Sequence, residues 1–164
     1  MRKSALVLGL VVPLLALTGG ARAHSLDTAL VIQAQGSVAL APAPATPPAT
    51  NTGAITVTWS PIQIAGVYEG APVAGTYTCA AATGTREGNL AHDNFAASPF
   101  MCSLSGGVGP TSITASFAGT RVGTGFVVGM EVAPTAYVEQ HVGLCEGTVL
   151  DPLTFQFVAF CQVT

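Results

Sequence analysis

Alternation of apolar and polar residues with a period of two recurs along the chain from Leu30 onward, and this pattern constrains the fold more than any other feature. The last alternating segment is the longest, and its apolar face carries Leu153, Phe155, Phe157, Ala159, Cys161 and Val163. A period of two places successive side chains on opposite faces of a β-strand. No stretch combines a helical apolar period with helix start and stop signals. The pattern therefore predicts strands throughout.

Turn-forming residues separate the alternating segments. Examples are Ser60-Pro61, Gly106-Gly107 and Asp151-Pro152. About eight short strands with turns between them predict an all-β fold, which we expect to be an antiparallel β-sandwich, with a small β-barrel as the alternative. Residues 41–50 are rich in proline and alanine, and we interpret them as a spacer or an edge loop because proline denies the strand ladder its N–H donors.

The first 23 residues have the three parts of a secretory signal peptide. Arg2 and Lys3 precede an apolar run over residues 5–17, and the small-residue triplet 21–23 follows. We expect cleavage after Ala23, which leaves residues 24–164 as a single secreted β domain with no integral membrane segment. Its destination would be the extracellular medium, the cell wall or the periplasm. The high alanine, glycine, valine and threonine content suggests a bacterial source.

The four cysteines predict two disulfides. An even number of cysteines in an exported chain is typical of such a framework, and four cysteines allow three pairings. We favour Cys79–Cys102 and Cys145–Cys161, because each would close a local loop between adjacent strands. The spacing contains no C-x-x-C pair, which argues against a zinc site. We therefore expect neither a metal nor another cofactor.

The charge balance excludes nucleic acid as a partner. Only 8% of the residues are charged, against about 25% in a typical soluble domain. After cleavage the chain keeps Arg86 and Arg121, has no lysine, and retains all 8 acidic residues. Binding to nucleic acid needs clustered Lys and Arg, and two arginines far apart in the sequence do not provide a cluster.

Two groups of side chains are candidates for binding or catalysis. His92 and Asp93 lie in a polar segment, residues 84–98, that we interpret as a loop, where a histidine next to a carboxylate is a candidate general base. The second group is on one face of a predicted strand, and a hairpin turn would add a residue from the partner strand. This second group comprises Tyr137, Glu139 and His141, with Glu131 on the partner strand.

The scarcity of titratable residues favours a non-catalytic binding or surface-interaction module, whose partner would be an extracellular protein or a glycan. The first alternative is a secreted hydrolase that uses the His92 loop or the Glu139 and His141 face. The second alternative is a secreted inhibitor or a small-ligand carrier. An inhibitor would present residues 98–102 on a loop stiffened by a disulfide, whereas a carrier would enclose an apolar cavity.

Overall fold

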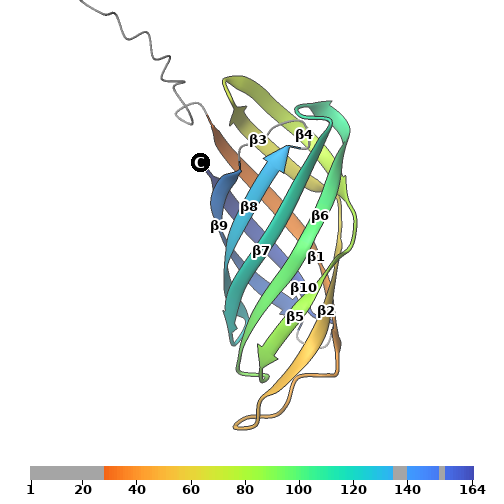
Figure 1. The fold of residues 1–164 in the computed structure, drawn as a ribbon, viewed down its shortest axis with the longest axis vertical. Helices are drawn as coiled ribbons and strands as arrows, with labels where there is room; N and C mark the ends of the chain where they lie inside the picture. Colours follow the sequence, from red (N-terminus) through yellow and green to blue (C-terminus); the bar gives the residue numbers. More distant parts are fainter. Residues whose placement is uncertain (1–27, 135–139, 152–153) are drawn as a thin grey trace, which may run out of the picture.

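Ten antiparallel strands form one sheet (Figure 1). The computed structural model describes residues 28–134, 140–151 and 154–164. The strands are β1 (Ala29–Ala41), β2 (Asn51–Trp59), β3 (Ile62–Tyr68), β4 (Ala71–Cys79), β5 (Ala82–Gly88), β6 (His92–Val108), β7 (Ser112–Val122), β8 (Gly125–Pro134), β9 (His141–Asp151) and β10 (Gln156–Val163). The described residues include no helix with the length and apolarity needed to cross a membrane. The predictions of an all-β antiparallel fold and of two disulfides are confirmed.

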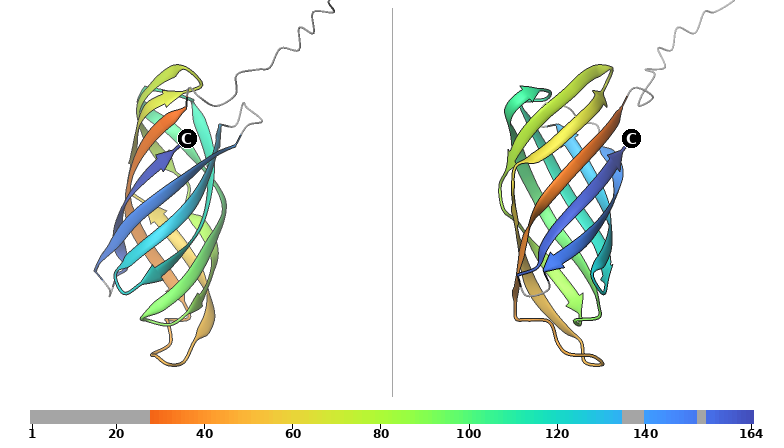
Figure 2. Two further views of the ribbon diagram at one scale, coloured as in Figure 1. Left: turned by 90° about the vertical axis from the view of Figure 1, so that its left-hand side faces the viewer. Right: turned by 180° about the vertical axis from the view of Figure 1, so that it is seen from behind.

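The sheet closes on itself. Strands β6 to β10 pair in sequence order, and β10 then pairs with β1 from Leu30 opposite Val163 to Ser37 opposite Gln156. On the other side β1 is joined to β6 through two pairs of strands, β3 with β4 and β2 with β5. The views from the side and from behind show the strands surrounding a common interior (Figure 2). We call this arrangement the closed sheet.

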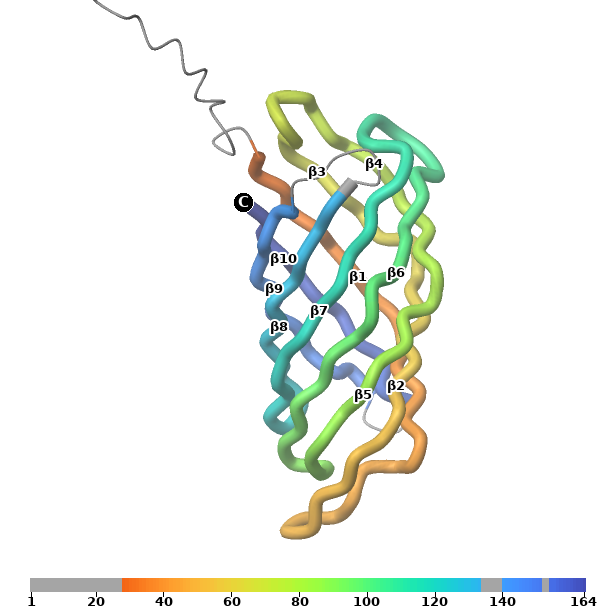
Figure 3. The backbone as a smooth tube through the Cα atoms, in the orientation of Figure 1, coloured from red at the N-terminus to blue at the C-terminus, as the bar shows by residue number. Residues whose placement is uncertain are grey.

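The two inserted pairs lie at opposite ends of the closed sheet. β2 pairs with the second half of β1, and β3 pairs with its first half. β2 and β3 therefore lie end to end alongside β1 (Figure 3). The break between them falls at Ser60-Pro61, where proline lacks the N–H that a ladder needs. In the same way β4 and β5 both pair with β6. We call the end that contains β2 and β5 the lower end, as in Figure 1.

Both disulfides join residues that are directly opposite each other on neighbouring strands. Cys79 on β4 faces Cys102 on β6, and Cys145 on β9 faces Cys161 on β10. This is the pairing that the sequence favoured. Two disulfides are typical of proteins from an oxidising, extracellular-type compartment.

The proline-rich segment connects β1 to β2 at the lower end. Ala45 forms an isolated parallel bridge with Asn89, and the carbonyl of Ala45 accepts a hydrogen bond from the N–H of Leu90. The side chain of Asn51 accepts a hydrogen bond from the N–H of Ala45 and donates one to the carbonyl of Ala43. The segment is therefore an edge loop held against the β5–β6 connection, and β1 before it is an integral strand of the sheet.

Candidate functional site: an apolar cavity with two buried arginines

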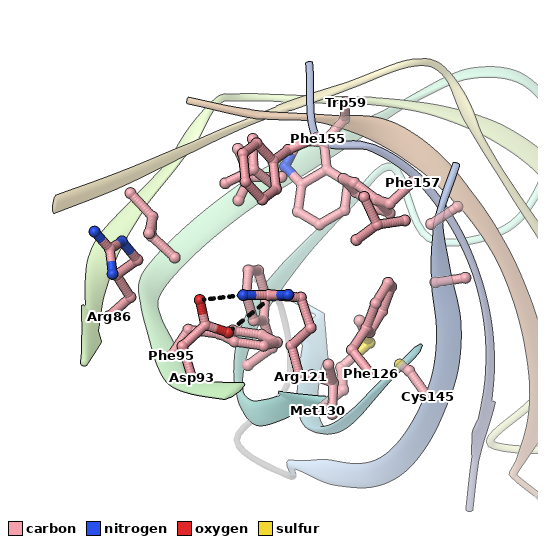
Figure 4. Close-up of a pocket in the computed structure, with 18 of the residues that line it drawn as sticks. Trp59, Arg86, Asp93, Phe95, Arg121, Phe126, Met130, Cys145, Phe155 and Phe157 are labelled. Atoms are coloured by element: carbon pink, nitrogen blue, oxygen red, sulfur yellow. Dashed lines mark hydrogen bonds and ion pairs between the residues drawn. The ribbon is translucent and has the colours of Figure 1, made fainter. Parts of the chain in front are cut away.

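The lower half of the closed sheet contains a partly open cavity of about 100 Å³. Its wall is apolar over most of its extent, with contributions from strands around the whole sheet, and it includes Val38, Leu40, Ile55, Phe95, Phe126 and Phe155. In the close-up, Trp59, Phe155 and Phe157 bound one side of the space, and Asp93, Arg121 and Met130 bound the other (Figure 4). The alternation of β1, β2, β6, β8 and β10 produces this lining because their inward residues are nearly all apolar.

An aromatic cluster surrounds Trp59, which lines both this cavity and a second, smaller cavity of about 20 Å³. The indole ring stacks on Phe100 with ring centroids 5.0 Å apart, and it makes edge contacts with Phe117 at 5.9 Å and Phe157 at 5.7 Å. Such packing fixes the orientation of the indole. Its Nε1 atom is nevertheless buried and has no hydrogen-bond partner. Trp59 therefore presents an unsatisfied donor within a rigid cavity wall.

Arg121 on β7 is buried in the wall of the cavity, and its guanidinium is fully satisfied. Nε and Nη2 donate to the two carboxylate oxygens of Asp93 on β6, each over 3.1 Å. The remaining hydrogen bonds go to the backbone carbonyls of Asn89 at 3.1 Å, Leu90 at 3.0 Å and Gly123 at 2.6 Å. A guanidinium has five N–H donors, so all five are used. The hydrogen bonds to these carbonyls tie the β5–β6 connection to the β7–β8 turn through the side chain of Arg121.

Gly88, at the end of β5, allows the close approach that places Asp93 in this pair. Gly88 is directly opposite Asp93 in the ladder, and its φ of +146° lies in a region that side-chain-bearing residues rarely adopt. A Cβ atom added to Gly88 would lie 2.6 Å from the Cβ atom of Asp93. Asp93 can therefore pack against the backbone of β5 only because residue 88 has no side chain.

Arg86 on β5 also lines the cavity, but its hydrogen bonding is incomplete. The residue is 2% exposed, and Nη2 donates to the carbonyl of Pro42 over 2.8 Å. Nε and Nη1 are buried without any hydrogen-bond partner. Among the described residues, no carboxylate forms an ion pair with Arg86. Burying a charged group is costly unless the group is paired, so this guanidinium has an unmet requirement for an acceptor.

The structure separates His92 from Asp93. Residues 84–98, which we expected to be a loop, belong mostly to β5 and β6, with only a short connection between them. Because adjacent strand residues point to opposite faces, the side chain of His92 is on the exposed outer face and that of Asp93 is inside. Asp93 is also committed to Arg121. The two residues therefore do not form the general-base pair that we considered.

The second predicted group is divided as well. Val132, not Glu131, is opposite His141, so Glu131 lies on the outer face while His141 is buried and 4% exposed. The expectation that these two residues share a face is wrong, because Glu131 lies opposite Val142, and residues adjacent to each other on a strand, such as His141 and Val142, point to opposite faces. His141 packs edge-on against Tyr68, with ring centroids 5.1 Å apart. Tyr137 and Glu139 lie outside the described residues.

The two histidines also lie toward opposite ends of the closed sheet. His141 pairs with Val132 on β8, and Val132 pairs in turn with Ala115 on β7. Ala115 pairs with Phe100 on β6, so His141 and Phe100 lie at the same level of the closed sheet. Phe100 is eight residues after His92 on the same strand, which corresponds to about 25 Å at roughly 3.3 Å per residue. One substrate group could not be within hydrogen-bond reach of both imidazoles.

Sequence reasoning missed Arg86, Arg121 and Trp59 as site residues. A signal for Arg121 was present, because extending the alternation of Ile113, Ala115 and Phe117 by two further steps places residue 121 on the inner face. Residue 86 is on the inner face of β5 by the same rule, counted from the buried Ala82. We found no cluster of three or more potential metal ligands in the parts of the chain that the structure describes.

No protein-family model matches this chain, and the comparisons with curated proteins and with solved structures give no match. The geometry of the closed sheet and its cavity therefore carries the functional argument.

Proposed function

We propose that the protein is a non-catalytic binding protein that holds a small apolar molecule in the cavity at the lower end of the closed sheet. The observation that carries this proposal is the cavity itself, which is enclosed by strands and lined largely by apolar side chains. Small-molecule sites are typically apolar concavities with a few polar groups placed to orient the ligand. Arg86, Trp59 and the Asp93–Arg121 pair are the polar groups in this wall.

The size of the cavity limits the ligand. An engineered cavity of about 150 Å³ in another protein accommodates benzene. The cavity here is about 100 Å³, so the part of the ligand that it encloses would contain at most roughly six carbon atoms. A larger molecule would extend past the cavity wall or displace a wall residue such as Phe155. We therefore propose a ligand with a short alkyl or single-ring apolar body.

The other functions considered from the sequence receive less support. The hydrolase proposal needs His92 and Asp93 to act together. His92 points outward and Asp93 is bound by Arg121, so the two residues do not face the cavity as an acid–base pair. For an inhibitor, residues 98–102 lie within β6 and carry the disulfide to β4. Phe100, Met101 and Cys102 pair with β7, and a segment held in a sheet in this way is a poor candidate for a reactive-site loop.

We also propose that the protein is exported and that residues 1–23 are removed as a signal peptide. The disulfides support an oxidising compartment, and the charged start, apolar run and small-residue triplet support cleavage. Native mass spectrometry of the protein from its source culture tests both parts. A mass for residues 24–164 with both disulfides would support export, and a mass that includes residues 1–23 would contradict cleavage.

Trp59 supplies a direct test of cavity binding, because it is the only tryptophan of the chain and lines the cavity. Its emission would be titrated with hexan-1-ol, benzyl alcohol, hexanoate and benzoate. We expect at least one probe to shift the emission saturably. The variant Ala159→Leu should abolish the shift by filling the cavity, and Ala96→Leu, on the exposed outer face, should leave it intact. Absence of binding by all four probes would refute the proposed function.

A further inference from the structure

We propose that the ligand of this cavity carries an anionic carboxylate that binds the guanidinium of Arg86. This inference rests on the proposed binding function and names the chemical class of the ligand. It begins with the contrast between the two arginines at the lower end. Arg121 uses all five of its donors, whereas two nitrogen atoms of Arg86 have no acceptor although the residue is 2% exposed.

The charges at this end of the cavity do not balance. Two guanidinium groups line it, and Asp93 is the one carboxylate among the described residues that line it. Both oxygens of Asp93 are already bound to Arg121. Buried charges in proteins are normally paired, and an isolated one is strongly unfavourable. One negative charge supplied by a ligand would balance the charges and give Arg86 the acceptors it lacks.

A carboxylate fits the donors better than other groups do. Arginine presents its N–H groups in a planar fork that matches the two oxygens of a carboxylate, and such charge-assisted bonds are among the strongest in proteins. A phosphate or sulfate ion would also accept these bonds, but it would leave the apolar wall around Trp59, Phe126 and Phe157 without a partner. The lining therefore favours an amphipathic acid, with its apolar body against the aromatic residues and its carboxylate at Arg86.

The lack of partners around Arg86 follows from the local sequence. On β5 the inward positions next to Arg86 are Gly84 and Gly88, which have no side chain to approach the guanidinium. The exposed neighbours Thr85 and Glu87 point to the other face of the strand. The chain thus places a carboxylate, Glu87, directly beside Arg86 in sequence, but the strand geometry keeps that carboxylate outside.

The test compares acids with neutral analogues of the same body, in the full protein and in two variants. Binding of hexanoate and hexan-1-ol, and of benzoate and benzyl alcohol, would be measured by Trp59 emission. The variants are Arg86→Met, which removes the charge inside, and Glu87→Gln, which removes a charge on the outer face of the same strand. If Arg86→Met does not fold, Arg86→Lys, which keeps the charge and loses the planar fork, replaces it.

We expect the unchanged protein to bind each acid about tenfold to a hundredfold more tightly than its alcohol, because hydrogen bonds to a charged group are among the stronger ones. Arg86→Met should abolish this preference, Arg86→Lys should reduce it, and Glu87→Gln should retain it. The inference is overturned if alcohols bind as well as acids, or if the preference survives in Arg86→Met. The first result leaves the cavity as a binding site for neutral molecules, and the second assigns the preference for acids to a group other than Arg86. Binding by none of the probes refutes the proposed function itself.

Discussion

Replacing Arg86 by methionine should stabilise the ligand-free protein. The substitution removes a buried guanidinium whose Nε and Nη1 lack acceptors, and each unsatisfied buried group costs about 1–3 kcal/mol. It also removes the hydrogen bond from Nη2 to the carbonyl of Pro42, worth about 0.5–1.5 kcal/mol. Methionine fills irregular apolar space with little strain. The balance is an expected gain of about 0.5–5.5 kcal/mol in the free energy of unfolding.

Arg121→Met is the matched comparison, because both arginines are buried at the lower end and line the same cavity. Here the substitution removes five hydrogen bonds and leaves the Asp93 carboxylate buried without its partner. Breaking a buried ion pair by removing one partner costs about 3–5 kcal/mol. The two substitutions should therefore change the free energy of unfolding in opposite directions.

Equilibrium unfolding in urea measures both effects. Each protein should first be unfolded and refolded with its disulfides intact, because a ligand carried through purification would stabilise the unchanged protein and mask the gain. Far-ultraviolet circular dichroism should be recorded beside Trp59 emission, since the indole lies in the cavity wall. A loss of stability in Arg86→Met as large as that in Arg121→Met would refute the reasoning. Arg86 would then be a structural group and not a binding residue.

Three further predictions concern stability and cavity size. Burial raises the pKa of Tyr77 above its ordinary value of 10.0. The contribution of Tyr77 to the free energy of unfolding is therefore fully present below pH 10. Above pH 10 the free energy of unfolding should fall by up to about 1.4 kcal/mol per pH unit until the pH exceeds the pKa of Tyr77 in the folded protein, as an alkaline titration would show. Removing the Cys145–Cys161 disulfide, whose residues are separated by 16 positions, should lower the free energy of unfolding in urea by about 3 kcal/mol. Phe155→Ala should enlarge the cavity, so emission titrations should show longer alkanoates binding more tightly than hexanoate.

Each of these three predictions has a specific control. Tyr77→Phe should remove the added alkaline sensitivity, and an unchanged slope in that variant would contradict the role of Tyr77. For the disulfide, the comparison uses the double variant Cys145→Ala with Cys161→Ala, so that no free thiol remains; equal stability with and without the bridge would contradict the estimate. For Phe155→Ala, an unchanged order of affinities among alkanoates would show that this ring does not limit ligand length.

The strands and the disulfides were predictable because both depend on local pattern. Alternation identified the inner residues of β1, β2, β7 and β10, and turn residues marked most of the breaks between strands. The closing ladder between β1 and β10 was not predictable, because alternation is the same in a sandwich and in a barrel. Residues 84–98 were assigned to a loop because the segment is polar and its apolar alternation is weak. Part of that polarity comes from Arg86 and Asp93, which face the interior.

The site was missed for a related reason. The search grouped His92 with Asp93 and Glu131 with His141, and it treated the arginines as isolated cations because they are far apart in the sequence. A strand register that differs by one residue exchanges the inner and outer faces. The same rule that separates His92 from Asp93 brings Asp93 to Arg121, over a sequence separation that no local pattern reveals.

The distribution of charge gives the carboxylate proposal its strongest context. Arg86 and Arg121 are the only Lys or Arg residues after residue 22, and both are buried at one end of the interior. Acidic residues such as Glu87 and Glu131 lie on the outer face of the described strands, which carries no Lys or Arg and therefore offers little attraction for an anion. Attraction would begin only inside the cavity, where low polarity strengthens it and one guanidinium is unpaired. Natural proteins commonly retain locally unfavourable groups where function needs them, and Arg86 is such a group in a sheet otherwise built by simple alternation.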